Sequence, residues 1–395
     1  LLNIARVNYY RTNLKDSISL ADRYLARVES FGDKRRTSRL LFELGFAKLL
    51  AGRTREGKPM LERALAIGEE IDDAEAIGYA CMGLMWNYIF WEPGTEERRT
   101  IFQQLGERAY AAAKQTGDNW LTTKTLGALS NEAALWGRPD RVRQFDQQLL
   151  ELSERTNDPR VRSETLFRIA FSRAGSGDYE EAVQLADESL RISLCPMDRL
   201  FARHAKGLSL AAMGRAEDGY DVLASVRADM ESGGLLQNGL MVEIPFGAAM
   251  VAKGDMARGI RHIVNSAKMY AQFGQPFATT FSHWMLGEIY GRMMIRDTKV
   301  TPWIIIKNIG FLLRTLPFVG WKAQRHLEIC VRQSRDLDMP GFLAGSLSNL
   351  GVVYLARKNK PAARASLEEA RAMAVAFDAK YLIDRIDGAL HELAG

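Results

Sequence analysis

A helix boundary near the middle of the chain constrains the fold most, because altered copies of it recur along the sequence. Gly177 interrupts one apolar periodicity, and Asp178 with Glu181 has the spacing of a capping box that begins a second helix. In this second helix apolar side chains return every three or four positions, so one face can lie against the preceding helix. Similar turns stand at Gly52, Gly137, Gly214, Gly254 and Lys358. The sequence therefore predicts an array of helix hairpins.

Small residues in the first helix of each predicted hairpin give the period of the array. The hairpins can be aligned on one small residue in each first helix: Gly45, Gly83, Gly127, Ala170, Gly207, Gly247, Gly287 and Gly351. Successive aligned residues are 37 to 44 positions apart, except for one longer step of 64. A Leu-Gly pair in the first helix and two alanines around a large apolar residue in the second match the tetratricopeptide pattern. We therefore predict an all-α fold, a right-handed superhelical solenoid of tetratricopeptide-like hairpins. Residues 1–395 are expected to form a single array of about eight to nine hairpins.

The long step predicts an insertion at residues 297–319, between the two helices of one hairpin. Its apolar side chains recur at helical spacing, which favours an amphipathic helix packed across neighbouring hairpins. The alternative is that it docks another domain, a partner or a membrane surface through Trp303, Ile306, Leu313 and Phe318. Lys307 and Arg314 interrupt the apolar run, so we do not expect a membrane span. Residues 379–394, apolar on one side only, are expected to form a C-terminal capping helix.

Composition and residue spacing argue against a catalytic, metal or nucleotide site in this chain. The five histidines lack metal-ligand spacing, and the glycine-rich turns lack the pattern of a nucleotide-binding loop. Since no nucleophile, base or metal cluster stands out, we expect no catalytic residues, no cofactor and no metal. The 53 basic and 48 acidic residues are interspersed, which argues against nucleic acid as a partner. Three widely separated cysteines, Cys81, Cys195 and Cys330, favour a reducing, cytoplasmic location.

Binding is a separate question, because a superhelix of hairpins forms a concave groove lined by its first helices. In tetratricopeptide geometry the positions three before, one after and four after the aligned glycine face this groove. With one neighbouring tyrosine, this rule selects as candidate contacts Asn87, Tyr88, Lys124, Asn131, Phe167, His204, Trp284 and Glu288. Its aromatic members suit anchors for a protein or peptide, although such residues also fill the seams between hairpins.

A resemblance to a known family narrows the expected function. The chain resembles the C-terminal repeat region of bacterial multidomain class III adenylate/guanylate cyclases in the segments Met285–Tyr290, Phe311–Phe318, Arg325–Glu328, Leu350–Lys360 and Ala365–Ala370. The resemblance implies a non-catalytic regulatory arm of a larger cytoplasmic signalling protein, preceded by a cyclase domain and an ATPase domain. Its partner would be a protein or peptide, including a domain of its own full-length chain, docked in the groove or on the insertion.

Two further expectations concern the protein as a whole. The chain begins at Leu1, not Met, within a helical pattern, so we expect it to be part of a longer protein. The alternative function is the small-molecule sensor region of an ATPase-type transcriptional activator, whose repeats would bind an inducer. Both functions predict the same fold and differ in the domain that precedes the repeats.

Overall fold

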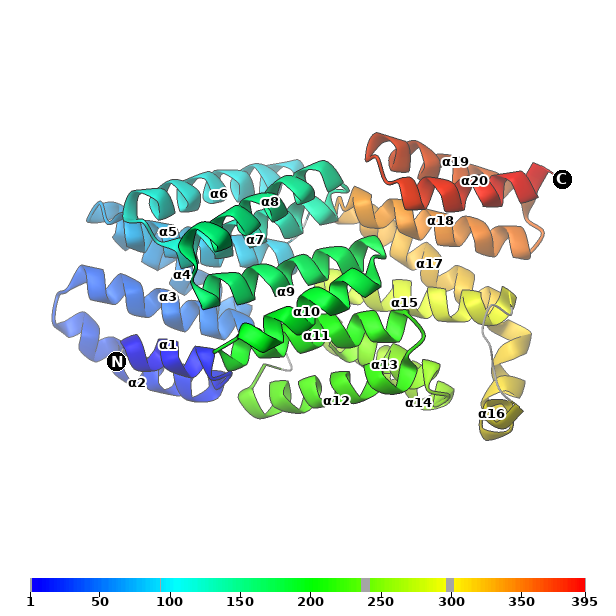
Figure 1. Ribbon diagram of the computed structural model, residues 1–395, viewed down its shortest axis with the longest axis horizontal. Helices are drawn as coiled ribbons and strands as arrows, with labels where there is room; N and C mark the ends of the chain where they lie inside the picture. Colours follow the sequence, from blue (N-terminus) through cyan, green and yellow to red (C-terminus); the bar gives the residue numbers. More distant parts are fainter. Residues whose placement is uncertain (1, 93, 236–241, 296–301, 395) are drawn as a thin grey trace. The chain divides into compact units, whose positions relative to one another are not determined.

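The computed structural model describes residues 2–92, 94–235, 242–295 and 302–394, which form helices joined by short connections (Figure 1). No strand occurs among these residues. The all-α, tetratricopeptide-like solenoid fold confirms the predicted fold class, whereas a single array over the whole chain stays a prediction. The described helices belong to two compact units. The first unit contains Leu1–Glu92, Glu96–Asn131 and Arg143–Val242, and the second contains Pro93–Thr95, Glu132–Val142 and Glu243–Gly395.

The first unit is built from consecutive helices that pair as hairpins. Its helices are α1 (Leu2–Tyr10), α2 (Leu14–Ser30), α3 (Lys34–Leu50), α4 (Thr54–Glu70), α5 (Ala74–Phe90), α6 (Glu96–Thr116), α9 (Pro159–Ser176), α10 (Tyr179–Ile192), α11 (Pro196–Ala212) and α12 (Ala216–Gly233). Both units receive residues from α7 (Asn119–Leu135) and α8 (Pro139–Thr156). Hairpin α3/α4 packs on hairpin α5/α6 through α4 and α5. Hairpin α9/α10 packs on hairpin α11/α12 through α10 and α11.

The second unit contains further hairpins and the insertion. Its helices are α13 (Glu243–Ala252), α14 (Met256–Gln272), α15 (Pro276–Ile295), α16 (Pro302–Thr315), the 3-10 helix η1 (Leu316–Phe318), α17 (Val319–Asp336), α18 (Pro340–Ala356), α19 (Lys360–Ala376) and α20 (Lys380–Ala394). The hairpins are α13/α14, α15/α17 and α18/α19. The insertion consists of α16 and η1, between α15 and α17 (Figure 1), and its predicted residues 297–301 lie outside the described residues. At the C-terminal end, α20 packs against α18 and α19.

The boundary between α9 and α10 shows how one hairpin closes. Gly177 ends α9 in the left-handed conformation with a φ of 90°, which residues with a side chain rarely adopt. Asp178 precedes α10, but its side chain makes no capping hydrogen bond in the described structure, so the predicted capping box is wrong. Glu181 instead pairs with Arg173 of α9, with 3.0 Å between Oε2 and Nε. This ion pair draws the carboxylate away from the helix start and ties α10 to α9.

Close helix packing explains the aligned glycines. A β-carbon at Gly351 would lie 2.6 Å from the γ-carbon of Leu367, so only glycine lets α18 approach α19 this closely. The same contact recurs between Gly45 and Leu61, Gly207 and Leu223, Gly247 and Ile263, and Gly287 and Leu327. Sixteen residues separate each glycine from its partner, except that forty separate Gly287 from Leu327. The insertion therefore adds twenty-four residues to one hairpin and leaves this packing unchanged.

Alanines form the seam between consecutive hairpins in the first unit. Ala170 of α9, Ala186 of α10 and Ala205 of α11 are fully buried against one another, with Phe171 and Leu185 packed around them. Because alanine side chains are short, three helices can meet at this point without leaving a void. The small residues of the repeat pattern thus determine the distance between these helices, and larger apolar side chains pack around them.

Candidate functional site

Asn87 and Tyr88, two predicted groove contacts on α5, differ in exposure. Asn87 is fully buried, and its amide oxygen accepts a hydrogen bond from Thr54 Oγ1 at 2.8 Å. Its amide nitrogen donates to Glu92 Oε1 at 2.9 Å. Tyr88 is half-buried, with Lys58 Nζ 5.3 Å from its ring centroid. Asn87 therefore ties the start of α4 to the end of α5, and only Tyr88 presents surface to a ligand.

Lys124 of α7 belongs to a buried charge cluster with two residues of α9. Its Nζ lies 2.9 Å from Glu164 Oε1, and Arg168 Nε donates to the same oxygen at 2.8 Å. Burial raises the pKa of Glu164, but Lys124 and Arg168 outweigh this effect and hold the pKa below its usual value. Asn131, in contrast, is exposed, and its amide donates to the carbonyl of Gly127 in its own helix at 3.0 Å. Lys124 is thus engaged by its own chain.

Phe167 and His204 are buried in the packing between α9 and α11. Phe167 stacks on Phe201 with ring centroids 5.3 Å apart. His204 meets Phe171 edge-on at 5.3 Å between ring centroids, and its Nδ1 has no hydrogen-bond partner among the described residues. Burial lowers the pKa of His204 to about 4, so its imidazole is neutral at pH 7.

The N-terminal helix α1 lies against inner helices of the first unit, a contact that the sequence did not indicate. Tyr10 approaches Trp120 of α7 edge-on, with 6.2 Å between ring centroids, and its hydroxyl accepts from Arg160 of α9 at 2.9 Å. Lys124 Nζ lies 5.0 Å from the ring centroid of Trp120. The end of α1 therefore packs against the same tryptophan of α7 that Lys124 contacts.

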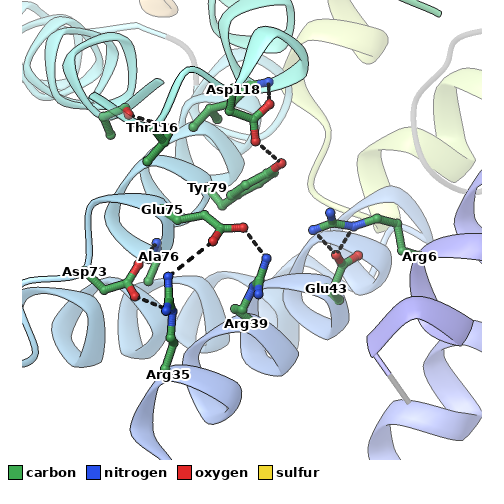
Figure 2. Close-up of polar contacts among 12 residues, drawn as sticks. Arg6, Arg35, Arg39, Glu43, Asp73, Glu75, Ala76, Tyr79, Thr116 and Asp118 are labelled. Atoms are coloured by element: carbon green, nitrogen blue, oxygen red, sulfur yellow. Dashed lines mark hydrogen bonds and ion pairs between the residues drawn. The ribbon is translucent and has the colours of Figure 1, made fainter. Parts of the chain in front are cut away.

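Ion pairs connect α1 with α3 and α3 with α5 in the first unit (Figure 2). Arg6 of α1 and Glu43 of α3 form an ion pair at 2.7 Å, and Arg39 of α3 pairs with Glu75 of α5. Figure 2 also shows Tyr79 of α5, whose hydroxyl donates to a carboxylate oxygen of Asp118 at 2.6 Å. Because these charges are neutralised within the chain, they are poorly suited to binding a charged peptide.

The second unit places Trp284 in an aromatic cluster that stays part-exposed. The aromatic cluster consists of Phe277, Phe281 and Trp284 on α15 and Phe342 on α18, all of them half-buried. Trp284 stacks on Phe281 with centroids 5.6 Å apart and lies 6.0 Å from Phe342. Phe277 lies 5.9 Å from Phe342. The spacing of four and three residues along α15 was a signal for this cluster, but the groove rule selected Trp284 alone.

A row of polar side chains runs beside the aromatic cluster across three helices. Glu288 of α15 accepts a hydrogen bond from the Asn349 amide of α18 at 2.7 Å. Arg385 of α20 donates to the Asn349 amide oxygen at 2.6 Å. Arg292 also donates to Glu288, at 2.8 Å. This polar ladder, Glu288–Asn349–Arg385, leaves Arg385 exposed and Glu288 half-buried. Of its members only Glu288 was predicted, because Asn349 and Arg385 lie outside the positions that the groove rule selects.

The four predicted docking residues of the insertion are exposed. Their exposed fractions are 70% for Trp303, 62% for Ile306, 70% for Leu313 and 59% for Phe318. The predicted packing of this apolar face across neighbouring hairpins is therefore wrong. The opposite face of α16 packs instead, because Asn308 on that face donates to the carbonyl of Gly254 at 2.7 Å. By length and composition alone, Pro302–Asp336 is the one described stretch apolar enough to cross a membrane.

Three further features of the described residues concern binding of a metal or a small ligand. No group of three or more His, Cys, Asp or Glu side chains that could hold a metal ion occurs among them. His283 and His326 face each other with 2.9 Å between their Nδ1 atoms, which gives two nitrogens only. A hollow of about 200 Å³ in the first unit is lined by Thr12, Pro196, Arg199, Leu200, Arg203 and Asp229. It is smaller than ordinary ligand pockets of about 300–1,000 Å³.

Solved structures match most of the chain at low identity. A human IFIT1 dimer with m7Gppp-AAAA is 13% identical, with 94% of this chain and 90% of that chain covered and a TM-score of 0.42. A monomeric mutant of IFIT1 with the same RNA is 16% identical, with 94% and 80% covered and a TM-score of 0.43. A circular tandem repeat protein with a novel repeat topology is 13% identical, with 96% and 88% covered and a TM-score of 0.17.

Comparison with protein families gives a narrower match. The family described as "Tetratricopeptide repeat" matches residues 343–376, which include all of α19 and most of α18. No curated protein matches the chain. No enzyme family is indicated by these comparisons. The matched repeat and the glycine-centred packing of the hairpins support a tetratricopeptide-type array.

Proposed function

We propose that this chain is a non-catalytic interaction module that docks a peptide or protein segment on the aromatic cluster and polar ladder of the second unit. The observation that carries the proposal is Trp284, half-buried and stacked on Phe281, next to polar side chains from α15, α18 and α20. Part-exposed aromatic residues provide large contact areas with few rotatable bonds, which makes them frequent anchors of protein interfaces.

The polar ladder would orient the bound segment. Arg385 is exposed and carries a positive charge, so it can pair with an acidic side chain of the partner or donate a hydrogen bond to one of its carbonyls. Asn349 is 4% exposed and held by Glu288 and Arg385, which keeps the ladder rigid. A rigid polar edge beside an apolar anchor matches the organisation of protein interfaces, in which hydrogen bonds surround a desolvated centre.

The test is selection of peptides from a phage-displayed random library on the intact chain. Enriched peptides should bind Trp284→Ala at least about 30-fold more weakly, because truncation of an aromatic anchor costs about 2 kcal/mol or more. Phe31→Ala, which removes a 66% exposed aromatic side chain from the first unit, is the control and should bind as the native chain does. No enrichment, or equal binding by Trp284→Ala, would contradict the proposal.

The wider context that we propose is regulatory. The resemblance to the repeat region of class III cyclases supports a place in a cytoplasmic signalling protein, with the docked partner either a separate protein or a neighbouring domain. Three free cysteines are consistent with a reducing compartment: burial raises the pKa of Cys81, Cys195 and Cys330 to about 11 each. The reading frame upstream of Leu1 tests this context, since it should encode a cyclase domain followed by an ATPase domain.

A further inference from the structure

The insertion helix α16 is held in place through one face only. Asn308 of this face donates to the carbonyl of Gly254, in the turn between α13 and α14, at 2.7 Å. Ile304 packs over the same glycine, since a β-carbon at Gly254 would lie 2.9 Å from its γ1-carbon. At the edge of the face, Lys307 Nζ lies 2.5 Å from a carboxylate oxygen of Asp255. These contacts fix the orientation of α16 on the second unit and leave the opposite apolar face uncovered.

The opposite face of α16 exposes a continuous apolar surface. Trp303, Ile306, Gly310 and Leu313 follow one another at spacings of three and four residues, so they lie along one stripe of the helix. The stripe continues through η1 to the start of α17. Of the thirteen exposed large hydrophobic side chains in the described residues, eight belong to this segment: Trp303, Ile305, Ile306, Ile309, Leu313, Leu316, Phe318 and Trp321. Exposed hydrophobic side chains gathered in one surface mark an interaction site. The other five exposed large hydrophobic side chains are scattered along the described residues.

The charge of this segment is uniformly positive. Residues 302–327 contain Lys307, Arg314, Lys322 and Arg325 and no aspartate or glutamate, although the whole chain has nearly equal numbers of acidic and basic residues. Lys307 and Arg314 are seven residues apart, so they lie along the same side of α16, next to the apolar stripe. Arg325 lies over the Trp321 ring, 5.2 Å from its centroid. An occupant of this surface must therefore be apolar at the centre and anionic around it.

We propose that the exposed face of α16, η1 and the start of α17 binds the surface of a membrane that contains anionic lipids. Tryptophans at both ends of the segment, Trp303 and Trp321, suit the headgroup region, and Ile306 and Leu313 between them suit the acyl chains. Arg314 can extend its charged end to a lipid phosphate while its methylene chain lies along the apolar stripe. Lys307 keeps its ion pair with Asp255 and adds its own methylene chain to the edge of the stripe. The inference is independent of the proposed peptide site, which uses other residues of the second unit.

The geometry indicates that α16 lies flat on the membrane and does not cross it. A helix of fourteen residues is about 21 Å long, shorter than the hydrocarbon core of about 30 Å. The helix α16 ends at Thr315 and is followed by η1, which contains Pro317, and then by α17. Ala323, Leu327 and Cys330 of α17 are fully buried, and α17 packs against α15 and α18. Only the surface side of α16, η1 and the first turn of α17 is available to lipid.

The experiment is vesicle co-sedimentation of the intact chain. Phosphatidylcholine vesicles containing phosphatidylserine should bind the chain at least about tenfold more tightly than pure phosphatidylcholine vesicles, and added salt should weaken the difference. The double variant Ile306→Ser with Leu313→Ser should lose about tenfold or more of this binding. Val375→Ser, which removes a 53% exposed valine from α19, is the matched control and should bind as the native chain does. All these side chains are exposed, so urea midpoints of the variants should stay unchanged.

Three results would overturn the inference. The native chain fails to bind the phosphatidylserine vesicles, the double variant binds as well as the native chain, or Val375→Ser loses binding to the same extent as the double variant. Capture of a folded protein through Ile306 and Leu313, in the absence of vesicle binding, would assign this surface to a protein partner instead. Binding of peptides at Trp284 is measured separately, so failure of one proposal leaves the other intact.

Discussion

Two glycines on the same helix should respond in opposite directions to the same substitution. In Gly351→Ala the added β-carbon would lie 2.6 Å from Leu367 Cγ and 2.7 Å from its Cδ2, both on α19. Leu367 is fully buried, so the two helices must separate or Leu367 must leave its position. Overpacking of this kind costs about 1–3 kcal/mol. In Gly345→Ala, also within α18, nothing lies within 4 Å of the new β-carbon.

The comparison isolates the steric contribution, because both variants gain the same helix propensity. Replacing glycine by alanine inside a helix stabilises it by about 0.8–1.0 kcal/mol. Gly345→Ala should therefore raise the unfolding free energy by about 1 kcal/mol, whereas Gly351→Ala should lower it by about 0–2 kcal/mol. The difference between the two, about 1–3 kcal/mol, is the overpacking term and should separate their urea midpoints by about 1 M.

The assay combines urea unfolding, followed by far-UV circular dichroism, with hydrogen exchange of α18 and α19. Hydrogen exchange is needed because repeat arrays can unfold locally, so a loss confined to one hairpin would be diluted in the global signal. Faster exchange in α18 and α19 for Gly351→Ala, and slower exchange for Gly345→Ala, is the expected result. Equal shifts of the same sign in both variants would refute the steric explanation of the aligned glycines.

Two further predictions concern buried charge in the first unit. Glu164→Gln leaves Lys124 and Arg168 buried without a full counter-charge and should lower the unfolding free energy in urea by about 3–5 kcal/mol. The control Asp218→Asn removes an exposed ion pair and should cost less than about 1 kcal/mol. Similar losses in both variants would contradict a stabilising role of the buried charge cluster. Asp198 of α11 is also buried, and its burial together with the nearby charge of Glu164 raises its pKa to about 7. The protonated carboxyl therefore stabilises the folded chain fully below the unfolded pKa of about 4, and this stability is lost as the pH rises to about 7. Asp198→Asn should therefore gain stability over the native chain across this window, on the order of 2–4 kcal/mol, and a pH-independent difference in thermal unfolding would disprove this assignment.

The repeat architecture could be predicted from the sequence because it depends on contacts between near neighbours in the chain. A glycine under a large apolar residue sixteen positions later is a local steric requirement, and it leaves a visible period. The insertion was predicted from the same alignment, because the step from Gly287 to Gly351 is 64 residues, whereas the other steps are 37 to 44. The C-terminal helix followed from one-sided hydrophobicity alone, and α20 packs as that pattern indicates.

The candidate site was harder to predict, because it depends on contacts between distant residues. Lys124 looked like a free groove cation, but its partner Glu164 lies forty residues further along the chain. The end of α1 reaches α7 and α9 through Tyr10, which no repeat pattern encodes. Periodicity predicted a helix in the insertion, but not which face packs, because the hydrogen bond from Asn308 to the carbonyl of Gly254 holds the less apolar face inward.

The hairpin formed by α15 and α17 has a consequence for how such a chain can acquire new parts. Lengthening the connection from sixteen to forty residues between Gly287 and Leu327 raises the entropy cost of closing the hairpin by only about 1 kcal/mol. A cost of this size is less than the gain from burying one leucine side chain. This connection is therefore a permissive position, where a segment of another sequence can be exchanged for α16 while Gly287 and Leu327 keep the two helices in register.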